Sequence, residues 1–163
     1  MDAHQFRDTM ARVTGPVAIV TAHRDGTPHG TTVSSLASLS MSPAMITVAL
    51  DNGSALLAIV RETGGFGVNV LSTGQHEAAV RFASRRDDRF AGTAWELVDG
   101  LPFLTGSSAW LRCEVSAEIP GGDHTLLLAT VRDCSTSDAT PLVYSRRTFG
   151  THAALPALAG AAS

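Results

Sequence analysis

Apolar and polar residues alternate strictly over residues 111–119, where Leu, Cys, Val, Ala and Ile occupy the odd positions and Arg, Glu, Ser and Glu the even ones. A repeat of two places side chains on opposite faces of a strand, so this segment is predicted to be a β-strand with one buried face. Residues 120–123, Pro-Gly-Gly-Asp, form a turn signal, and residues 124–131 predict a returning strand. We therefore expect a long β-hairpin here.

Shorter strands are predicted before this hairpin. The apolar residues 17–22 are followed by Asp25-Gly26, a strong signal for a two-residue hairpin turn, and residues 28–34 predict the returning strand. Further strands are expected at residues 45–50 and 66–71. Short helices are expected at residues 3–12, 54–62 and 76–84, the second of them beginning at the N-cap candidate Ser54.

Six or seven strands with two or three short helices, and no regular β-α-β alternation, predict a mainly β fold. The expected architecture is an antiparallel barrel with peripheral helices. A chain of 163 residues suits one domain, which we expect over residues 1–150. An alanine-rich tail at residues 151–163 is expected to fray.

Charge and composition narrow the classes of partner. The formal charge is −3 and the arginines form no basic stripe, so no nucleic-acid partner is expected. Lysine is absent, so a bound phosphate must be held by arginine, hydroxyls or backbone N–H groups. Cys113 and Cys134 form no disulfide framework, and neither a signal peptide nor a membrane helix is visible; we expect a cytoplasmic protein without a membrane partner.

Hydroxyl side chains are concentrated between Gly30 and Pro43, interleaved with small apolar residues. Hydroxyls and nearby N–H groups can satisfy a phosphate, a ribityl chain or the polar edge of a flavin, while Val33 and Leu36 offer apolar surface to its ring. A solvent-exposed edge strand with a serine-rich loop explains the same composition. The segment alone leaves both interpretations open.

Three further motifs each have a functional and a structural interpretation. Residues 51–54, Asp-Asn-Gly-Ser, precede a predicted helix and suit a phosphate site or an ordinary N-cap. His124, after Gly122 and Asp123, could bind substrate or move a proton, or follow a turn by chance. Four arginines could face a nucleotide phosphate or form a solvated face; they are Arg81, Arg85, Arg86 and Arg89.

Familiar catalytic motifs are missing. Gly65-Phe66-Gly67 has Val70 where the dinucleotide fingerprint needs a third glycine, and the sequence contains no Walker phosphate loop, no GxSxG elbow and no metal-spaced His/Cys set. A nicotinamide nucleotide, if bound, is therefore not expected on a Rossmann unit.

Taken together, the chain resembles the flavin reductase domain family, the small NAD(P)H:flavin oxidoreductases of two-component monooxygenases. The resemblance extends from about Phe6 to Phe149. Six fragments carry it, in chain order. The first three are residues 14–15 and 17–21; residues 25–26 and 29–32; and residues 34–35, 38–40 and Pro43. The last three are residues 66–71; residues 82–83 and 88–90; and residues 122–124. The resemblance implies the FMN-binding split-barrel fold.

The resemblance also implies roles for individual residues. Residues matching Thr32, Val33, Ser34 and Ser35 line the isoalloxazine in this family. Those matching Ser38 and the run Asp51, Asn52, Gly53 and Ser54 lie along the ribityl and phosphate. The segment matching Arg81 and Phe82 closes over the flavin, and the histidine matching His124, next to Asp123, faces the nicotinamide and is the expected catalytic residue.

By the same resemblance, NADH or NADPH reduces FMN or FAD, and the reduced flavin leaves to serve a flavin-dependent monooxygenase. A homodimer with the flavin near its interface is expected. Two alternatives stay open: a protein that holds its flavin or another cofactor permanently for electron transfer, and a binding module without activity. Ala44, Ala129-Thr130 and Phe149 depart from the usual family pattern, which puts substrate preference in doubt more than fold.

Overall fold

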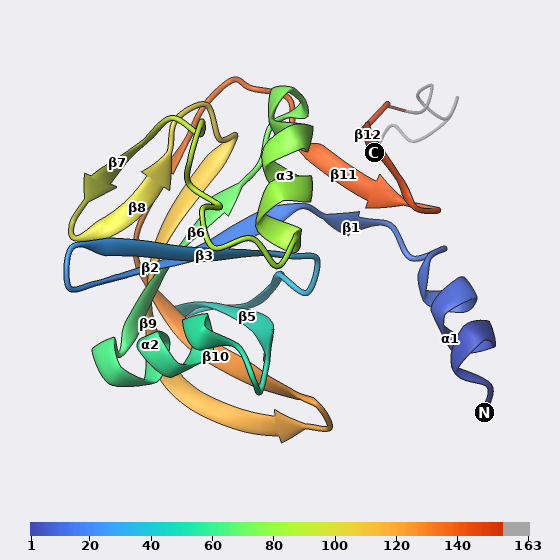
Figure 1. Ribbon diagram of the computed structural model, residues 1–163, viewed down its shortest axis with the longest axis horizontal. Helices are drawn as coiled ribbons and strands as arrows, with labels where there is room; N and C mark the ends of the chain where they lie inside the picture. The colour runs from blue at the N-terminus through green and yellow to red at the C-terminus, as the bar shows by residue number, and fades with distance from the viewer. Residues whose placement is uncertain (155–163) are drawn as a thin grey trace, which may run out of the picture.

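The structure is a computed structural model that describes residues 1–154 and is mainly β (Figure 1). Three α-helices and one 3₁₀ helix are present among these residues: α1 (Ala3–Met10), α2 (Ala55–Thr63), η1 (Thr73–Gln75) and α3 (His76–Ala83). The strands of the first half are β1 (Gly15–Pro16), β2 (Ala18–Arg24), β3 (Thr27–Val33), β4 (Ala37–Met41), β5 (Ala44–Asp51) and β6 (Gly65–Val70). Those of the second half are β7 (Trp95–Val98), β8 (Leu101–Leu104), β9 (Ala109–Gly121), β10 (His124–Thr136), β11 (Leu142–Ser145) and β12 (Thr148–Thr151).

Seven strands form one antiparallel sheet in the order β3-β2-β6-β9-β10-β5-β4. The sheet curls so that β3 and β5, far apart in this order, approach each other. Ser35, just after β3, joins them: its hydroxyl donates to the carbonyl of Ala49 on β5 (3.2 Å) and accepts from the amide of the same residue (3.0 Å). The Ser35 side chain therefore connects the end of β3 to β5, two strands that do not pair through their backbones.

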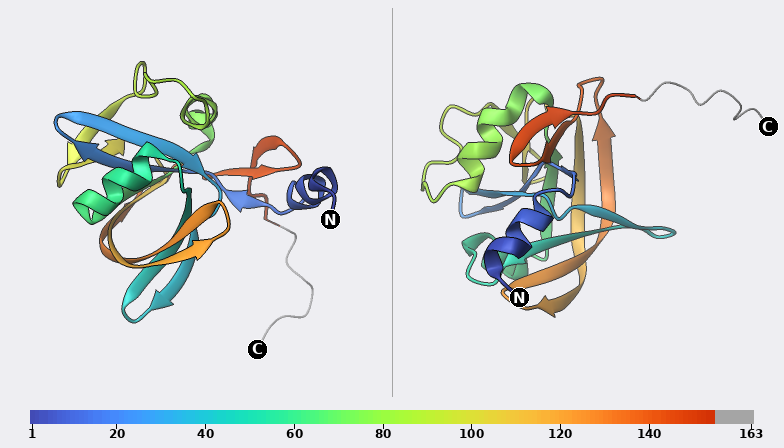
Figure 2. Two further views of the ribbon diagram at one scale, coloured as in Figure 1. Left: turned by 60° about the horizontal axis from the view of Figure 1, so that its bottom comes forward. Right: turned by 90° about the vertical axis from the view of Figure 1, so that its right-hand side faces the viewer.

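Two apolar clusters hold this arrangement together. The larger fills the barrel beneath α2, with side chains such as Val20, Leu57, Phe66 and Leu127 fully buried. The smaller joins β2, α3, β8 and β11 and includes Phe82. Figures 1 and 2 show α3 over one end of β3 and α2 near the other, so β3 lies between the two helices.

Three segments project from this body. α1 stands apart from the barrel beside the turn between β11 and β12, and the β4–β5 hairpin extends to the right in the second view of Figure 2. The end of the β9–β10 hairpin also reaches beyond the barrel core. Met41, at the tip of the β4–β5 hairpin, is 87% exposed, and Ile119 on β9 is 46% exposed.

The predicted fold class, mainly β and antiparallel with two or three short helices, is confirmed, and the open sheets are compatible with a split barrel. Each predicted helix and strand overlaps an observed one, and Ser54 is the N-cap residue of α2. The predicted Asp25-Gly26 turn is also present, with both residues at positive φ, 52° and 76°.

Two expectations require correction. The described residues form twelve strands rather than six or seven. The six that were missed are β1, β4, β7, β8, β11 and β12, each of five residues or fewer, which is too short for a repeat of two to stand out. The predicted buried face of residues 111–119 ends at Val115, since Ala117 and Ile119 lie on the projecting arm and are exposed.

The expected boundary at residue 150 falls inside β12, whose last residue is Thr151. Residues 155–163, most of the predicted tail, lie outside the described residues.

Candidate functional site

Strand β3 borders two clefts, one at each end. The first, called here the apolar cleft, has a volume of about 450 Å³ and lies between the carboxyl end of β3, helix α3 and the β11–β12 hairpin. It is lined by Val17, Thr32, Val33, Ser34, Ala79, Val80, Ala83, Ser84, Tyr144, Arg147 and Phe149. Most of these side chains are aliphatic or aromatic, so the cleft suits a flat ring.

The second cleft, called here the arginine cleft, has a volume of about 700 Å³ and lies between the start of β3, the amino end of α2 and the loop after α3. It is lined by Pro28, His29, Gly30, Thr31, Asp51, Gly53, Ser54, Ala55, Leu56, Arg85, Arg86, Asp87, Arg89 and Phe90. Thr31 and Thr32 are consecutive, as are Ser84 and Arg85. The linings of the two clefts are therefore adjacent in sequence along β3 and at the end of α3.

The position of β3 follows from its local sequence. The Asp25-Gly26 turn sets its register with β2, pairing Gly30 with Thr21 and Thr32 with Ile19. Gly30 allows α3 to pack closely, because a Cβ atom there would lie 2.9 Å from Cε1 of the buried Phe82. A glycine at this point brings the helix against the strand and so shapes both clefts.

The hydroxyl groups predicted to bind a ligand have partners within the protein. Thr32 donates to the carbonyl of Ala79 (2.7 Å) and Thr31 to that of Phe82 (3.5 Å), both on α3. Ser35 bonds to Ala49 on β5. The hydroxyls therefore anchor α3 and close the barrel, while Ser34 is exposed at the apolar cleft.

Ser38 has a different place among the predicted residues. It lies on β4 opposite Ile46 of β5 and is exposed. Ser35 and Ser38 are absent from the described linings of both clefts. In sequence both residues follow Ser34, which lines the apolar cleft. In space both contact β5 instead, Ser35 through Ala49 and Ser38 by pairing with Ile46.

The amino end of α2 opens into the arginine cleft. Asp51 accepts a hydrogen bond from the amide of Gly53 (2.7 Å), which tightens the turn before the helix. The N-cap Ser54 makes no side-chain capping bond within the described structure, and the first turn of α2 holds no acidic residue. The N–H groups of this turn and the positive end of the helix dipole therefore remain available to an anion.

Three arginines face the same cleft. Arg89 is fixed by the backbone, donating to the carbonyl of Gly30 (2.8 Å) and to that of Arg86 (3.1 Å). Within residues 1–154, no carboxylate lies within ion-pairing distance of Arg85, Arg86 or Arg89. Their positive charge is not neutralised by such a pair, which favours an anionic ligand.

His124 is the first residue of β10 and lies directly opposite Asp51 of β5. Its Nδ1 donates to Oδ1 of Asp123 (2.8 Å), which leaves Nε2 free to meet a ligand. This bond, and the charge of His124, lower the pKa of the Asp123 carboxyl below its usual range. The pair therefore has a set orientation beside the turn that leads into α2.

Asn52, which entered the sequence prediction as part of the 51–54 motif without a role of its own, joins the two predicted turns. Its side chain donates to the carbonyl of Gly122 (3.1 Å) and accepts from the hydroxyl of Thr125 (2.7 Å). The backbone N–H of Asn52 also donates to the carbonyl of Asp123 (3.0 Å). The turn at residues 51–54 and the turn holding His124 therefore form one unit.

The structure places Arg81 and Phe82 away from the two clefts. Arg81 donates to the carbonyl of Ala91 and to the hydroxyl of Thr93 (3.2 Å), so it holds the loop after α3 from the opposite side. Phe82 is fully buried, with its ring edge-on to Phe90. In this conformation Phe82 has no surface to offer a ligand, because the apolar face of α3 turns it into the core.

Other lining residues were missed by the sequence reasoning. Tyr144, Phe149 and Arg147 come from β11, β12 and the turn between them, and their strands are too short to show a pattern. His29 lines the arginine cleft, and burial lowers its pKa, with further lowering by the charges of Arg24 and His23. The sequence signal that could have identified His29 was its position in the strand that follows the Asp25-Gly26 turn.

The described residues contain no group of three or more His, Cys, Asp or Glu side chains placed to hold a metal ion. Among the helices of residues 1–154, none has the length and apolar character needed to cross a membrane.

A ligand with a flat, largely apolar ring and an anionic chain fits this arrangement. Its ring would enter the apolar cleft, and its phosphate would meet the helix end and the arginines of the other cleft. The fold and the clefts thus define an open antiparallel barrel with an apolar cleft and an arginine-lined cleft along β3, an arrangement suited to an aromatic nucleotide.

Comparison with known proteins gives the family. Residues 10–153 match the model of the flavin reductase like domain. The chain is 39% identical to the actinorhodin polyketide dimerase of Streptomyces coelicolor, covering 98% of this chain and 90% of that protein. It is 33% identical to the reductase component of 4-nitrophenol 4-monooxygenase/4-nitrocatechol 2-monooxygenase of Rhodococcus opacus, covering 92% and 81% respectively.

Solved structures agree with these relatives. The NADH:FAD oxidoreductase SgcE6 of Streptomyces globisporus, in complex with NAD and FAD fragments, matches with a TM-score of 0.89 and 28% identity, covering 93% of each chain. The chain belongs to the flavin reductase like domain family.

Proposed function

We propose that this protein is an NAD(P)H-dependent flavin reductase that uses NADH or NADPH to reduce FMN or FAD and releases the reduced flavin to a flavin-dependent monooxygenase. When bound, the flavin supplies the hydride chemistry at its ring, and the protein needs no side-chain nucleophile. The work of the chain is to bind and orient the two nucleotides.

The observation that carries the proposal is the pair of clefts along β3. The apolar cleft matches the character of a flavin ring, and the arginine cleft matches its phosphate. Thr32, Val33 and Ser34 would border the ring, and Gly53 and Ser54 would meet the phosphate. Asp51 would border the phosphate from the arginine cleft, and Ser35 and Ser38, which lie outside both clefts, would act indirectly through their contacts with β5.

We assign His124 to the nicotinamide nucleotide. Its Nδ1 is engaged by Asp123, so Nε2 is the atom that would bind the substrate. Asn52 would hold this turn at a set distance from the helix that receives the phosphate. Arg81 and Phe82 would act indirectly, by positioning the loop that carries Arg85, Arg86 and Arg89.

The reaction can be followed by the loss of NADH or NADPH absorbance. Purified protein is expected to accelerate this oxidation when FMN, FAD or riboflavin is added, and a matrix of two nicotinamides against three flavins would measure the preference. No acceleration with any pair would refute the proposal. A protein that stays yellow through gel filtration and does not turn over added flavin would instead hold its flavin permanently.

We also propose a homodimer. Phe6 (53%) and Met10 (48%) are exposed apolar residues four positions apart on one face of α1, and Val13 (59%), just after the helix, is also exposed. Met41, at the tip of the separate β4–β5 arm, is a further exposed apolar residue. Large exposed apolar residues that project from the body support contact with a second copy.

Two further assignments rest on the same proposal. A reducing, cytoplasmic location is supported by the absence of a disulfide between Cys113 and Cys134 in the described residues. A monooxygenase partner is supported by the named role of the Rhodococcus opacus relative as a reductase component.

A further inference from the structure

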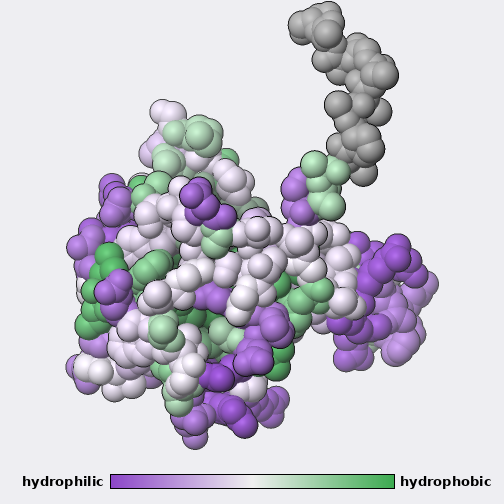
Figure 3. Space-filling model, turned by 90° about the horizontal axis from the view of Figure 1, so that it is seen from above, coloured by the Kyte–Doolittle hydropathy of each residue, from purple (hydrophilic) through white to green (hydrophobic). Residues whose placement is uncertain are grey.

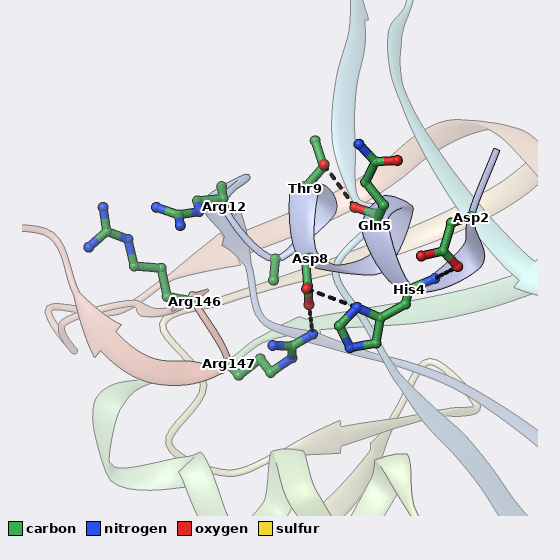
Figure 4. Close-up of a pocket in the computed structure, with 9 residues that line it drawn as sticks. Asp2, His4, Gln5, Asp8, Thr9, Arg12, Arg146 and Arg147 are labelled. Atoms are coloured by element: carbon green, nitrogen blue, oxygen red, sulfur yellow. Dashed lines mark hydrogen bonds and ion pairs between the residues drawn. The ribbon is translucent and has the colours of Figure 1, made fainter.

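Several arginines of this protein form ion pairs on its surface. Figure 4 shows one such pair beside α1, where Arg147 meets Asp8. An exposed pair of this kind adds little to stability. Arg61 differs from the other ion-paired arginines of residues 1–154, because its guanidinium alone also bonds to a hydroxyl, that of Thr125.

Arg61 of α2 holds both strands of the β9–β10 hairpin. On β9 it donates to the carboxylate of Glu118, at 3.3 and 3.0 Å from Nε and 2.8 Å from Nη2. On β10 its Nη2 donates to the hydroxyl of Thr125 (3.3 Å). The planar fork of donors on a guanidinium allows both contacts at once. One side chain therefore clamps the hairpin on either side of the turn at residues 120–123.

Thr125 passes this contact on to the turn that holds His124. Its side chain is buried, and its hydroxyl accepts from Arg61 and donates to Oδ1 of Asn52 (2.7 Å). Asn52 in turn donates to the carbonyl of Gly122 (3.1 Å). A buried hydroxyl that loses a partner is costly, so these bonds favour one arrangement of the turn.

The end of β9 next to the turn has few other supports. β6 pairs with β9 only as far as Glu114, so beyond Val115 the backbone of β9 pairs with β10 alone. Residues 116–121 are exposed. Apolar burial therefore does not fix this end of the hairpin, and the Arg61 clamp does.

Helix α2 is a firm support for the clamp. Leu57 and Val60 are fully buried in the larger apolar cluster, and Arg61 lies in the last turn of the helix. The amino end of the same helix opens into the arginine cleft. One rigid element thus contacts the cleft assigned to the flavin phosphate and the hairpin assigned to the nicotinamide nucleotide.

We propose that Arg61 is a positioning residue for the nicotinamide nucleotide and acts through Thr125 on the turn that holds His124. The inference rests on the proposed function, because it concerns the nucleotide assigned to His124. The clamp keeps the Asp123–His124 pair in its set orientation. Without it His124 is still present, but its turn can move, and a nucleotide that needs a fixed partner binds more weakly.

Steady-state kinetics at saturating FMN, with flavin titration alongside, test the proposal in Arg61→Met. Methionine keeps the apolar stem and the helix preference but removes every donor. KM for NADH or NADPH is expected to rise about fivefold to tenfold, while kcat and the Kd for flavin stay within about twofold of wild type.

Arg132→Met is the matched control. Arg132 on β10 also bridges the two strands of this hairpin, through Glu114 (2.7 Å), but it lies away from the turn and makes no bond to Thr125 within residues 1–154. Its loss is expected to leave KM, kcat and the Kd for flavin within about twofold of wild type. A rise in KM equal to that of Arg61→Met would contradict a role specific to the turn.

Thr125 provides a conservative comparison. Thr125→Ser retains the hydroxyl that meets Arg61 and Asn52, and it should keep KM for NAD(P)H within about twofold of wild type. Thr125→Val removes the hydroxyl at similar size and should raise KM at least as much as Arg61→Met does. Equal KM values in the two variants would count against transmission through Thr125.

A double variant separates positioning from direct contact with the nucleotide. If Arg61 acts through His124, adding Arg61→Met to His124→Ala should change KM less than twofold. A guanidinium that itself bound the nucleotide would raise KM by the same factor in both backgrounds. That equal factor, an unchanged KM in Arg61→Met, or a parallel loss of flavin affinity would overturn the proposal.

Failure of this inference is distinct from failure of the proposed function. Wild-type protein that oxidises NADH or NADPH with flavin, together with a wild-type KM in Arg61→Met, overturns the role of Arg61 alone. Wild-type protein without this activity refutes the proposed function and the inference with it. If Arg61→Met does not fold, as judged by its melting curve, Glu118→Ala frees the same guanidinium from β9, and a KM unchanged in that variant would overturn the role of the clamp.

Discussion

Several side chains at the proposed site make structural contacts within the protein. Thr31 and Thr32 hold α3 against β3, and Ser35 closes the barrel at Ala49. The Asp123–His124 pair presents one ring nitrogen outward and engages the other. A variant at one of these residues can therefore lose ligand binding directly or lose the packing of α3 and β5, and the measurements must distinguish the two.

His124→Ala tests the assignment to the nicotinamide. The variant is expected to lower kcat/KM for NADH or NADPH by about tenfold or more, through loss of one directed hydrogen bond, while the Kd for flavin changes only severalfold. Steady-state kinetics and flavin titration measure the two quantities. An equal loss of both would contradict the assignment.

Asp123 should report on the same contact through its acidity. Its pKa is lowered chiefly by the hydrogen bond from His124 and then by the histidine's charge, so His124→Ala should raise the pKa toward the ordinary 3.8. A carboxyl with a lowered pKa in the folded state stabilises the fold above its unfolded pKa and loses that effect as pH falls through the folded value. An NMR titration of Asp123 in both proteins would show the difference; identical titrations would argue against the contact.

Gly30 should not tolerate a methyl group. In Gly30→Ala the new Cβ would lie 2.9 Å from Cε1 and 3.0 Å from Cδ1 of Phe82, so the free energy of unfolding is expected to fall by about 1–3 kcal/mol. Gly150→Ala, on β12, has nothing within 4 Å of its new Cβ and is the matched strand control. Denaturant unfolding compares the two, and equal stabilities would contradict the close packing.

At the scale of elements, the site depends on turns that meet rather than on one motif. The turn before α2 and the β9–β10 turn approach because β5 and β10 are neighbours, with Asp51 opposite His124. Asn52 then bonds the turns together. The turn proposed to receive the flavin phosphate and the turn that holds the proposed nicotinamide residue are thereby bonded to each other.

Asn52→Ala is predicted to weaken that coupling. The variant loses the bonds to Gly122 and Thr125, at about 1 kcal/mol each, and the freed His124 turn should raise KM for NAD(P)H more than it raises the Kd for flavin. Thermal unfolding and kinetics check the two parts. A double-mutant cycle with Thr125→Val would show no interaction energy if the two residues act independently.

At the scale of the whole molecule, hydrophilic side chains dominate the projecting part on the right of Figure 3, where α1 lies in Figure 1. Phe6, Met10 and Val13 are nevertheless exposed on this segment. α1 is joined to the body by the Asp8–Arg147 pair and by the bond from the amide of Arg146 to the carbonyl of Ala11. An apolar face on so lightly attached a helix suits a second copy.

The homodimer proposal predicts that Phe6→Glu with Met10→Glu gives a monomer. Sedimentation analysis should give twice the chain mass of 17.0 kDa for wild type and the single mass for the variant, because two buried charges would oppose association. Leu97→Glu, at an exposed apolar residue on β7, is the control and should leave the dimer intact. A monomeric wild type would rule the proposal out.

The sequence alone determined those features that depend on neighbouring residues. The alternation at residues 111–119, the Asp25-Gly26 turn and the N-cap Ser54 each specify a strand, a hairpin or a helix start through local backbone preferences. The ordered fragments also sufficed to predict the family, which the comparisons confirm. The short strands β11 and β12 escaped prediction because pairing with one another and with β1 stabilises them.

Only the tertiary structure decided which side chains share a cleft. Register between β5 and β10 brings Asn52 beside Gly122, and the packing of α3 turns Phe82 inward and Arg81 toward the loop at Ala91. The β11–β12 turn delivers Arg147 to the apolar cleft from more than a hundred residues beyond Thr32. Such meetings arise from long-range pairing and burial of the whole chain, which local sequence does not encode.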